Sequence, residues 1–548
     1  MAGRTLKEPP KLGGALPLVG HMHRFARNPH TFMMQLRQQL GDVAEFKMFH
    51  HSMVLLTGRD ASEAFYRASD DVLDQGPAYK IMTPVFGKGV VFDAPIPRKN
   101  QQLHMLMTAL RDKPMRAYSD VIVAEVEGLL KTWGESGETD LLEFTKGLTL
   151  YTSTHCLLGS EFRHELNAEF AGIYHDLERG IRPIAYVFPN LPIPVFWKRN
   201  KARARLQTLV TGILDRRSRK PEGSANVFHT LLDARYDDGT PLSPHEITGM
   251  LIAAVFAGHH TTSGTAAWVL IELLRHPDEL KKVVTEIDEL LGPDGRISFE
   301  SLRQVPNLEN VIKEVLRLHP PLIILMRKVV RDFQVGDYLI GAGKYVCAAP
   351  PVTHGIASLF PDPDAFVPDR YAPERAEDRD VFAWQAFGGG RHKCSGNAFA
   401  LFQIKAIFCV LLRRYRFELV NPPDTYRDDY TKMVVQPASP CPIRYRRRQV
   451  DRTAVTLTRV RAAQPEGVGQ AFRVTVDRDL CKGHGACMAE APEIFRVDDA
   501  GRLTLLQDSC DGMWLAKARA AVKYCPTQAI HLAPDTGDCP RAPLNAIP

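Results

Sequence analysis

One cysteine lies in a glycine-rich segment that is suited to holding a flat cofactor. Cys394 is near the end of the segment from Phe387 to Gly396, directly before a stretch predicted to be a helix from about Asn397 to Tyr415. Glycines let a backbone pass close to a macrocycle, because they have no Cβ atom. A thiolate at a helix N-terminus is stabilised by the helix dipole, and nearby amide N–H groups would tune a bound iron. The segment therefore indicates a thiolate-bound iron.

A second candidate for chemistry lies inside a long apolar helix that is predicted to begin near Ser243. This helix contains Ala257-Gly-His-His260-Thr261-Thr262. Gly adds chain entropy, and Thr competes for the backbone carbonyl of the preceding turn, so both residues cost helix stability. A kink beside a cofactor would explain why they are here.

Three further cysteines form an iron-ligand pattern in the last part of the chain. The run Cys481-Lys-Gly-His484-Gly-Ala-Cys487, followed later by Cys525-Pro, resembles single-cluster bacterial ferredoxins. The four-iron version has another Cys where His484 stands, so the three remaining thiolates match a 3Fe-4S cluster. A 4Fe-4S cluster completed by His484, or a zinc site, is the alternative. Cys510 and Cys539 fall outside the pattern.

These residues are positioned by two bodies of different size. Up to about Tyr445 the chain has helix-period stretches broken by Pro and Gly, with a strand-like stretch from Phe333 to Val346. Near the C-terminus, FRVTVDRDLC and GRLTLLQD alternate like strands, and MWLAKARAAVKYC is typical of a short helix. We therefore predict a mainly α large domain with a minor β-sheet over 1–448, a linker over 449–470 and a small α+β domain over 471–548.

The glycine-rich segment resembles the haem-binding loop of the cytochrome P-450 family. The matching pattern is Phe387-x-x-Gly390-x-x-x-Cys394-x-Gly396. The resemblance implies a cytochrome P-450 fold and haem b, with Cys394 as the ligand of the haem iron. It also implies that Thr261 helps to deliver protons to bound dioxygen, with His260 where many relatives carry an acid.

Two other patterns strengthen this resemblance. Glu314 and Arg317 are three apart on a predicted helix and share one face, and Arg370 follows in the motif Phe366-x-Pro-x-Arg. They are similar to the family's E-x-x-R pair and the arginine that joins it. We expect a buried ionic network with a structural role.

The resemblance becomes specific at two stretches. The run Ala257 to Thr262 and the loop from Tyr79 to Asp93 are similar to the sterol 14α-demethylase branch of the family. This implies three successive oxygenations of the 14α-methyl group of a sterol, with release of formate, each using one dioxygen and two electrons. The aliphatic side chain of Ile81 leaves room near the sterol C4 position, which favours a lanosterol-like substrate.

The same resemblance assigns further residues to the haem and to the substrate. The haem propionates would be held by Arg327 and His392, with a hydrogen bond from Tyr79, and His104 is a further candidate. The apolar sterol slot would be lined by Tyr79, Ile81, Met82, Phe86, Phe92, Ala257, Leu322 and Met433.

Charge and apolar content restrict the partners. The net charge of +6 is modest for 548 residues and gives no argument for nucleic acid, which would call for a basic stripe, so we expect no nucleic-acid partner. No stretch reaches the roughly 18 apolar residues of a membrane span, and no signal-peptide pattern precedes the first domain, so we expect a cytoplasmic protein without a transmembrane anchor. Residues 473–548 carry a charge near −1 and the rest near +7. Opposite charges favour transient docking of the two domains, and the tether raises their effective concentration.

The sequence also bears on the source of the electrons and on two alternative functions. No G-x-G-x-x-G nucleotide-binding turn occurs in the chain, which implies a separate NAD(P)H-dependent ferredoxin reductase. The alternatives are a haem-thiolate hydroxylase of another lipid and a haem and cluster redox sensor without turnover. Dioxygen-dependent product formation separates an enzyme from a sensor.

Overall fold

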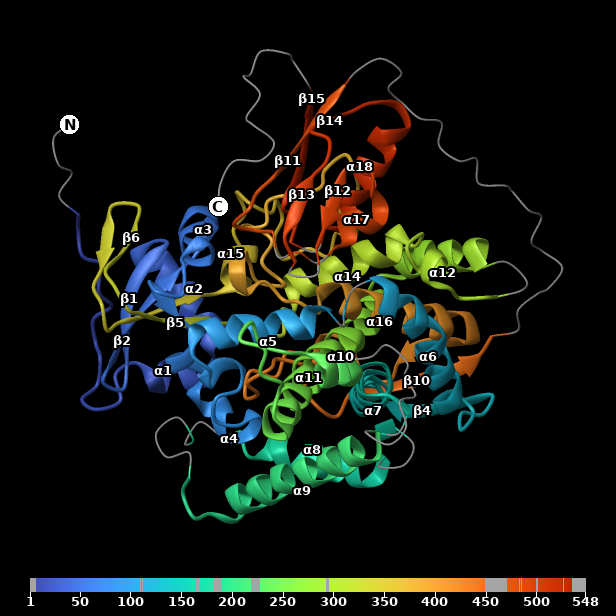
Figure 1. Ribbon diagram of the computed structural model, residues 1–548, viewed down its shortest axis with the longest axis horizontal. Helices are drawn as coiled ribbons and strands as arrows, with labels where there is room; N and C mark the ends of the chain where they lie inside the picture. Colours follow the sequence, from blue (N-terminus) through green and yellow to red (C-terminus); the bar gives the residue numbers. More distant parts are fainter. Residues whose placement is uncertain are drawn as a thin grey trace.

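The computed structural model describes residues 6–108, 110, 112–160, 162–163, 167–181, 185, 190–217, 227–291, 295–448, 471–481, 483, 485–498, 501–525 and 527–534. Figure 1 shows a large body, which extends to residue 448, and a small red body that lies against it. The linker predicted over 449–470 lies outside the described residues.

Helices make up most of the large body. The α-helices of the described residues are α1 Met22–Arg27, α2 Pro29–Leu40, α3 Gly58–Arg67, α4 Thr83–Phe86, α5 Ile96–Thr108, α6 Asp112–Leu130, α7 Leu141–Ser153, α8 Asn167–Arg179, α9 Pro194–Arg217, α10 Val227–Asp233, α11 Pro244–Arg275, α12 Pro277–Leu291, α13 Phe299–Leu302, α14 Pro306–Leu318, α15 Pro350–His354, α16 Asn397–Arg414, α17 Ala486–Glu490 and α18 Gly512–Tyr524. Short helical turns used below are η1 Gly76–Met82, η2 Val91–Asp93, η3 Thr154–Leu158, η6 Pro368–Tyr371 and η7 Gly390–His392.

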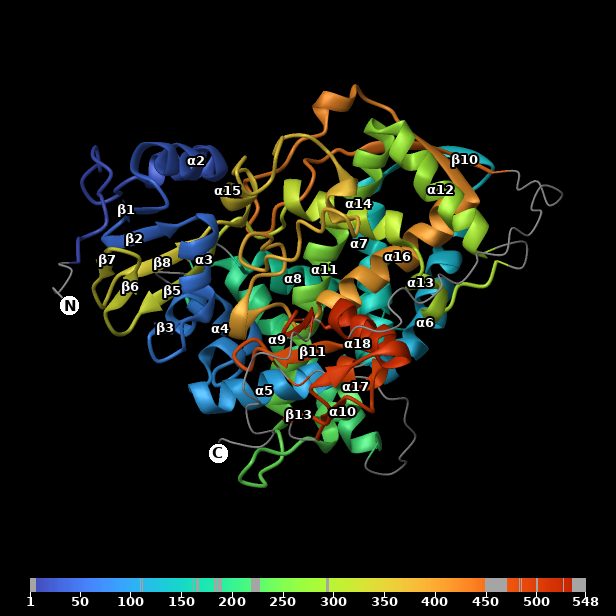
Figure 2. The ribbon, with the colours of Figure 1, turned by 90° about the horizontal axis from the view of Figure 1, so that it is seen from above.

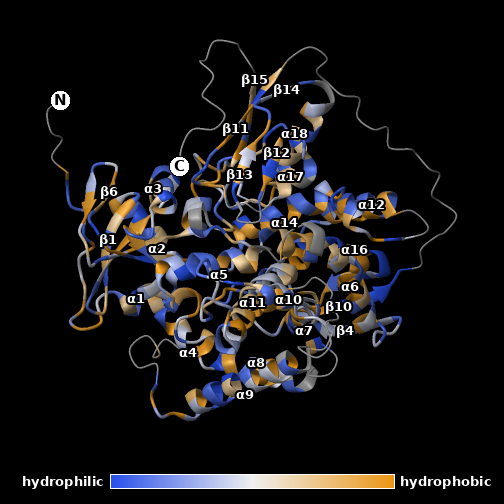
Figure 3. Cartoon of the chain, in the orientation of Figure 1, coloured by the Kyte–Doolittle hydropathy of each residue, from blue (hydrophilic) through white to orange (hydrophobic). Residues whose placement is uncertain are grey.

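Helix α11 lies at the centre of the large body (Figure 2). Ser243 and Glu246 form a capping box at its start, since each side chain accepts a hydrogen bond from the backbone N–H of the other. Most of its residues are buried, as expected for a helix that is apolar on all faces. Outer helices are amphipathic: α12 buries Val283, Ile287 and Leu291 at a spacing of four, and Figure 3 shows both hydrophobic and hydrophilic residues along it.

A five-stranded sheet forms one side of the large body. Its order is β1-β2-β8-β5-β3, with β2 and β8 parallel and the other pairs antiparallel. Its strands are β1 Val43–Met48, β2 His51–Leu56, β3 Leu73–Asp74, β5 Leu325–Val329 and β8 Tyr345–Ala348. Together with the hairpin of β6 Phe333–Val335 and β7 Tyr338–Ile340, strand β8 confirms the strand-like stretch predicted from Phe333 to Val346.

A second sheet contains the last strand of the large body and packs against the main apolar core. Strand β10 Pro442–Arg447 pairs with β4 Ser136–Asp140 on one side and with β9 Tyr415–Leu419 on the other. The buried residues Tyr415, Ile443 and Tyr445 join the main apolar core here. No helix within the described ranges is both long enough and apolar enough to cross a membrane.

The small body has its own sheet and core. Strand β11 Phe472–Val476 lies between β14 Ser509–Cys510 and β15 Ile530–Pro534, and β12 Phe495–Val497 pairs with β13 Leu503–Leu505. Helices α17 and α18 pack together beside the sheet. The two predicted strands and the predicted helix of this unit are confirmed, and so is its α+β class.

Candidate functional site

The Cys394 loop is a tight turn that leads directly into α16. The backbone N–H of Cys394 donates a hydrogen bond to the Phe387 carbonyl at 2.8 Å, and Gly396 is the N-cap residue of the helix. Gly390 has a positive φ of 58°, and a Cβ atom here would clash with the backbone carbonyl of Tyr66. The loop therefore requires glycine at this position, both for its conformation and for its close approach to α3.

The Cys394 side chain keeps accessible surface although protein surrounds it on other sides. Burial raises the pKa of its thiol, and the Gly396 N–H and the Lys393 ammonium partly oppose this rise. A thiol in this position is deprotonated when it binds a metal, because the metal charge outweighs the cost of burial.

Buried positive charge gathers beside this loop. Arg327 of β5 donates to the Phe65 carbonyl at 2.7 Å, but its Nε atom makes no hydrogen bond among the described residues, and burial lowers its pKa to about 10. Lys99 of α5 lies 3.3 Å from a carboxylate oxygen of Asp70, whose other oxygen is 2.5 Å from His392 Nε2. Burial raises the pKa of Asp70, but His392 and Lys99 outweigh it and hold this pKa well below its usual range.

Two buried cations thus accompany one buried carboxylate. Buried charges are normally compensated, so this surplus fits an anionic group such as a haem propionate. The glycine cradle of Gly390 and the accessible Cys394 fit the rest of a haem. His104 lies elsewhere along α5, where a Cβ atom added to Gly501 of the small body would be 2.5 Å from its ring. Its role toward haem stays a prediction.

The Thr261 segment lies on α11, which is one continuous helix through the position of the predicted kink. The Thr261 hydroxyl donates to the Ala257 carbonyl at 2.7 Å. His259 Nδ1 is 3.1 Å from the Thr149 hydroxyl, and His260 Nε2 is 3.5 Å from a carboxylate oxygen of Glu178. Burial lowers the pKa of both histidines, which favours neutral imidazoles at pH 7.

The predicted substrate loop packs onto α11 through aromatic rings. Tyr79 of η1 stacks on Phe92 of η2 at 4.8 Å, and Phe86 of α4 lies 6.2 Å from both Phe92 and Phe256 of α11, measured between ring centroids. Ile81 and Met82 are buried in the same core cluster. The structure therefore brings these five predicted residues together against the central helix.

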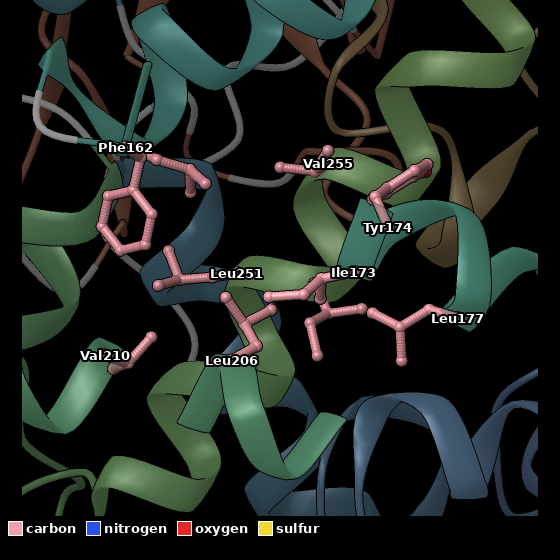
Figure 4. A pocket seen from close by; sticks show the side chains of 10 residues that line it. Phe162, Ile173, Tyr174, Leu177, Leu206, Val210, Leu251 and Val255 are labelled. Atoms are coloured by element: carbon pink, nitrogen blue, oxygen red, sulfur yellow. The ribbon is translucent and has the colours of Figure 1, made fainter. Parts of the chain in front are cut away.

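The other three predicted substrate residues are accessible. Leu322 and Met433 keep 42% and 52% of their surface exposed, and Ala257 is exposed on α11. The Leu322 and Met433 loops are linked, because the Val435 N–H donates to the Pro321 carbonyl at 2.8 Å. None of the eight predicted residues lines the apolar cavity of Figure 4, which lies among η3, α8, α9 and α11 and holds about 10 Å³, room for about one water molecule.

The predicted ionic network is present and fully buried. Arg317 Nη2 lies 2.7 Å and Arg370 Nε 3.1 Å from the same Glu314 oxygen, and the hydroxyl of Tyr371 donates to the other oxygen at 2.9 Å. Arg317 also donates to backbone carbonyls of the segment before η6. The network fastens α14 to η6, which confirms the structural role expected from the sequence.

The three candidate cluster ligands of the small body lie in or against one apolar cluster. Cys487 is buried at the start of α17, and Cys481 and Cys525 pack against the same core. Burial raises the pKa of Cys487 to about 12, with added contributions from Cys525 and Cys481, and the Ala529 N–H donates to the Cys525 sulfur at 3.3 Å.

Two residues of the cluster motif, His484 and Pro526, cannot be placed. His484, Pro526 and Cys539 lie outside the described residues, and Cys510 is buried in β14. In the described part of the chain, no three His, Cys, Asp or Glu side chains are arranged to hold a single metal ion.

Sequence reasoning missed Asp70 and Glu178. Asp70 belongs to an ordinary polar run before β3, and Glu178 is one of several charges on α8. Neither stands in a recognisable motif, so the sequence holds no signal for them. Lys99 follows another basic residue, Arg98, but this pair stands in no motif that points to haem.

Comparison with known proteins agrees with this geometry. The family model described as cytochrome P-450 matches residues 9–443, and one described as a 4Fe-4S single cluster domain matches residues 474–532. The retinoic acid-bound cyanobacterial CYP120A1 superimposes with a TM-score of 0.71 at 23% identity, covering 81% of this chain and all of that one, which shows the fold.

Curated relatives match over the same large domain. A sterol 14α-demethylase of Mycolicibacterium vanbaalenii is 48% identical over 452 residues, which are 82% of this chain and 100% of that protein. A sterol 14-demethylase of Arabidopsis thaliana is 37% identical (81% and 92%), and the human lanosterol 14α-demethylase is 35% identical (81% and 87%). The chain therefore belongs to the cytochrome P-450 family, within its sterol 14α-demethylase group, and carries a C-terminal domain of the single-cluster iron-sulfur type.

Proposed function

We propose that the protein removes the 14α-methyl group of a lanosterol-like sterol by three successive oxygenations that end in release of formate. The observation that carries this proposal is the identity of 48% over the full length of a relative named sterol 14α-demethylase. The packing of the Tyr79 to Phe92 loop onto α11 supports it, because this apolar surface suits a flat hydrophobic substrate.

The residues of the large domain divide into cofactor and substrate groups. Bound haem would supply the activation of dioxygen. Cys394 would hold its iron, Phe387, Gly390 and Gly396 would shape the loop, and Arg327 and His392, with Tyr79 and His104, would face the propionates. The sterol would contact Tyr79, Ile81, Met82, Phe86, Phe92, Ala257, Leu322 and Met433.

Thr261 and His260 would handle protons. The Thr261 hydroxyl donates to the Ala257 carbonyl at 2.7 Å, and to pass a proton on it would give up this hydrogen bond for another acceptor. His260, held neutral by burial and close to Glu178, can accept a proton and give it up again.

Electrons would come from a cluster held by Cys481, Cys487 and Cys525. We infer a 3Fe-4S cluster from the three thiolates, with 4Fe-4S as the alternative that the matched domain description favours. Electron paramagnetic resonance of the isolated protein, with iron and sulfide analysis, separates the two. The variant His484→Cys should convert a three-iron spectrum into a four-iron one, and an identical spectrum would contradict the three-iron assignment.

The cluster would receive its electrons from a separate NAD(P)H-dependent ferredoxin reductase. We also propose the domain boundaries given above: the large domain at 1–448, the linker at 449–470 and the small domain at 471–548. The cytoplasmic location stays a prediction.

The deciding experiment is addition of lanosterol to the holoenzyme, followed by turnover with dioxygen, NADPH and a ferredoxin reductase. We expect a low-spin to high-spin change in the optical spectrum and formation of formate with the 14-demethylated sterol. A clear preference for a C4-monomethyl sterol would contradict the role of Ile81. A thiolate-type carbon monoxide spectrum without any response to sterols would refute the substrate assignment.

A further inference from the structure

The small body contacts the large one through a mostly buried arginine. Arg303 follows α13, and its Nη2 lies 2.5 Å from a carboxylate oxygen of Glu490 on α17. Its guanidinium also lies 3.6 Å above the ring of Tyr524 on α18. The Arg303 and Glu490 side chains keep only 20% and 15% of their surface exposed. A desolvated ion pair that is reinforced by a cation–π contact is a strong anchor.

A second ion pair of the same polarity lies at the edge of this contact. Arg67, the last residue of α3, lies 3.2 Å from a carboxylate oxygen of Asp477. Both arginines belong to the large body and both carboxylates to the small one. This arrangement agrees with the opposite net charges of the two parts of the sequence.

Apolar contact between the bodies accompanies the ion pairs. Leu480 and Ala529 of the small body are buried in one cluster with Phe65, Tyr66 and Phe382 of the large body, and Cys481 and Cys525 pack against it. Two of the three candidate cluster ligands therefore lie at the boundary between the bodies.

This boundary is continuous with the Cys394 loop. Tyr66 contacts Gly390 through its backbone carbonyl. Lys393, which directly precedes Cys394, interacts electrostatically with the thiols of both Cys525 and Cys394. Lys393 therefore lies near both a candidate iron-sulfur ligand and the candidate haem ligand.

We propose that the contact formed by Arg303, Arg67 and Phe382 with Glu490, Tyr524, Asp477 and Leu480, here named the Arg303 interface, is the route by which the cluster reduces the haem of the same chain. The proposal rests on the electron supply included in the proposed function, but not on the identity of the substrate. Each transfer oxidises the cluster by one electron and reduces the haem iron by one. An NAD(P)H-dependent reductase replaces the electron that the cluster has lost.

The test measures electron transfer from the cluster to the haem in the full-length protein with both groups bound and without sterol. Under carbon monoxide, a light pulse on an added flavin photosensitiser with a sacrificial electron donor reduces the cluster, and the ferrous carbon monoxide band of the haem is followed. The variant Arg303→Glu places two carboxylates together, so we expect the rate to fall about tenfold or more. The swap Arg303→Glu with Glu490→Arg restores the attraction and should return the rate to within about threefold of the original. The matched control is Arg444→Glu, an exposed arginine of β10 that pairs with Glu138 on β4.

Deuterium uptake over residues 477–481 gives a second readout that does not depend on electron flow. It should rise in Arg303→Glu and return in the swap, while the paramagnetic signal of the cluster keeps its intensity. Equal rates and uptake in Arg303→Glu and the original protein would overturn the proposal, and so would a slow variant that the swap does not rescue. If transfer behaves as expected but no sterol is demethylated, only the proposed substrate fails.

Discussion

At the scale of single residues, Thr261 and Thr265 form a matched pair one turn apart on α11. Each hydroxyl donates to the carbonyl four residues earlier, at 2.7 Å for Thr261 and 2.8 Å for Thr265. Thr261 lies beside the exposed Ala257, whereas Thr265 is buried within the packed part of the helix. The two hydroxyls therefore make the same kind of hydrogen bond, but only Thr261 lies beside accessible surface.

This pair allows a direct test of proton delivery. In Thr261→Ala we expect product formation to fall about tenfold or more while NADPH oxidation continues, because electrons are consumed without the required protons arriving. Product and NADPH are measured in the same reaction. Thr265→Ala should leave their ratio unchanged. A ratio in Thr261→Ala equal to that of the original protein would refute the role of Thr261.

Residues close together in the sequence were predicted best. The Cys394 loop is contiguous, so its spacing alone predicted both the turn and the helix that follows it. The pairing of His392 with Asp70 joins positions 322 residues apart, and only the packing of α3 and η7 brings them together. No local pattern contains that information.

At the scale of elements, the Glu314 network joins α14 to η6 and should respond strongly to the loss of Glu314, the acid that Arg317 and Arg370 share. In Glu314→Gln we expect the free energy of unfolding to fall by about 3 to 5 kcal/mol, because two buried guanidinium groups lose their shared carboxylate. Urea unfolding followed by circular dichroism measures this change. Glu138→Gln breaks an exposed pair with Arg444 and should cost under about 1 kcal/mol. Similar losses in both variants would contradict the assignment.

A second element-scale network predicts a pH dependence of stability. His319, at the end of α14, stacks on Trp268 of α11 at 3.7 Å and lies 3.1 Å from an Asp428 oxygen. Burial opposes its protonation, but Asp428 and Glu272 outweigh burial and raise its pKa to about 9. An unfolded histidine has a pKa near 6.5, so the folded state binds the extra proton between these two values.

The stabilisation from His319 is therefore complete below about pH 6.5 and is lost as the pH rises through about 9. We expect the free energy of unfolding to fall by about 3 kcal/mol over this range in excess of any fall in His319→Gln. Urea unfolding at a series of pH values gives both curves. Parallel curves for the two proteins would show that His319 does not carry the effect.

Elements were predicted well where their ends are marked in the sequence. Ser243 and Glu246 begin α11 at the expected place, and α16 begins directly after the glycine loop. The kink expected at Thr261 rested on helix propensity, but the Thr261 hydroxyl is satisfied within the helix, and α11 is assigned as one continuous helix.

At the scale of the whole molecule, the two ion pairs of the Arg303 interface should contribute unequally. The Arg67 side chain is about one third exposed and keeps a second partner, Glu63, at 2.8 Å, so its contact with Asp477 is weak. We expect Arg67→Ala to slow cluster-to-haem transfer by no more than about threefold, far less than Arg303→Glu. The carbon monoxide assay described above measures both. An effect of Arg67→Ala as large as that of Arg303→Glu would place the anchor at α3 instead.

The order of the domains and the sign of their attraction could be predicted from the sequence, but the docked surface could not. Arg303 is one of 69 basic residues, and nothing in its neighbourhood distinguishes it. Its partners Glu490 and Tyr524 are 187 and 221 positions away. Their meeting depends on the folded shapes of two bodies, which local patterns do not encode.

The location of Arg303 and Glu490 in one polypeptide has a consequence for how the interface can change over generations. Both residues are encoded by a single gene and are inherited together, so recombination between genes cannot separate a matched pair. A substitution at one position can then be compensated at the other without the loss of compatibility that threatens partners encoded apart. We therefore expect the charges of this pair to vary jointly among descendants that keep the fusion, whereas the ligand cysteines stay fixed by their chemistry.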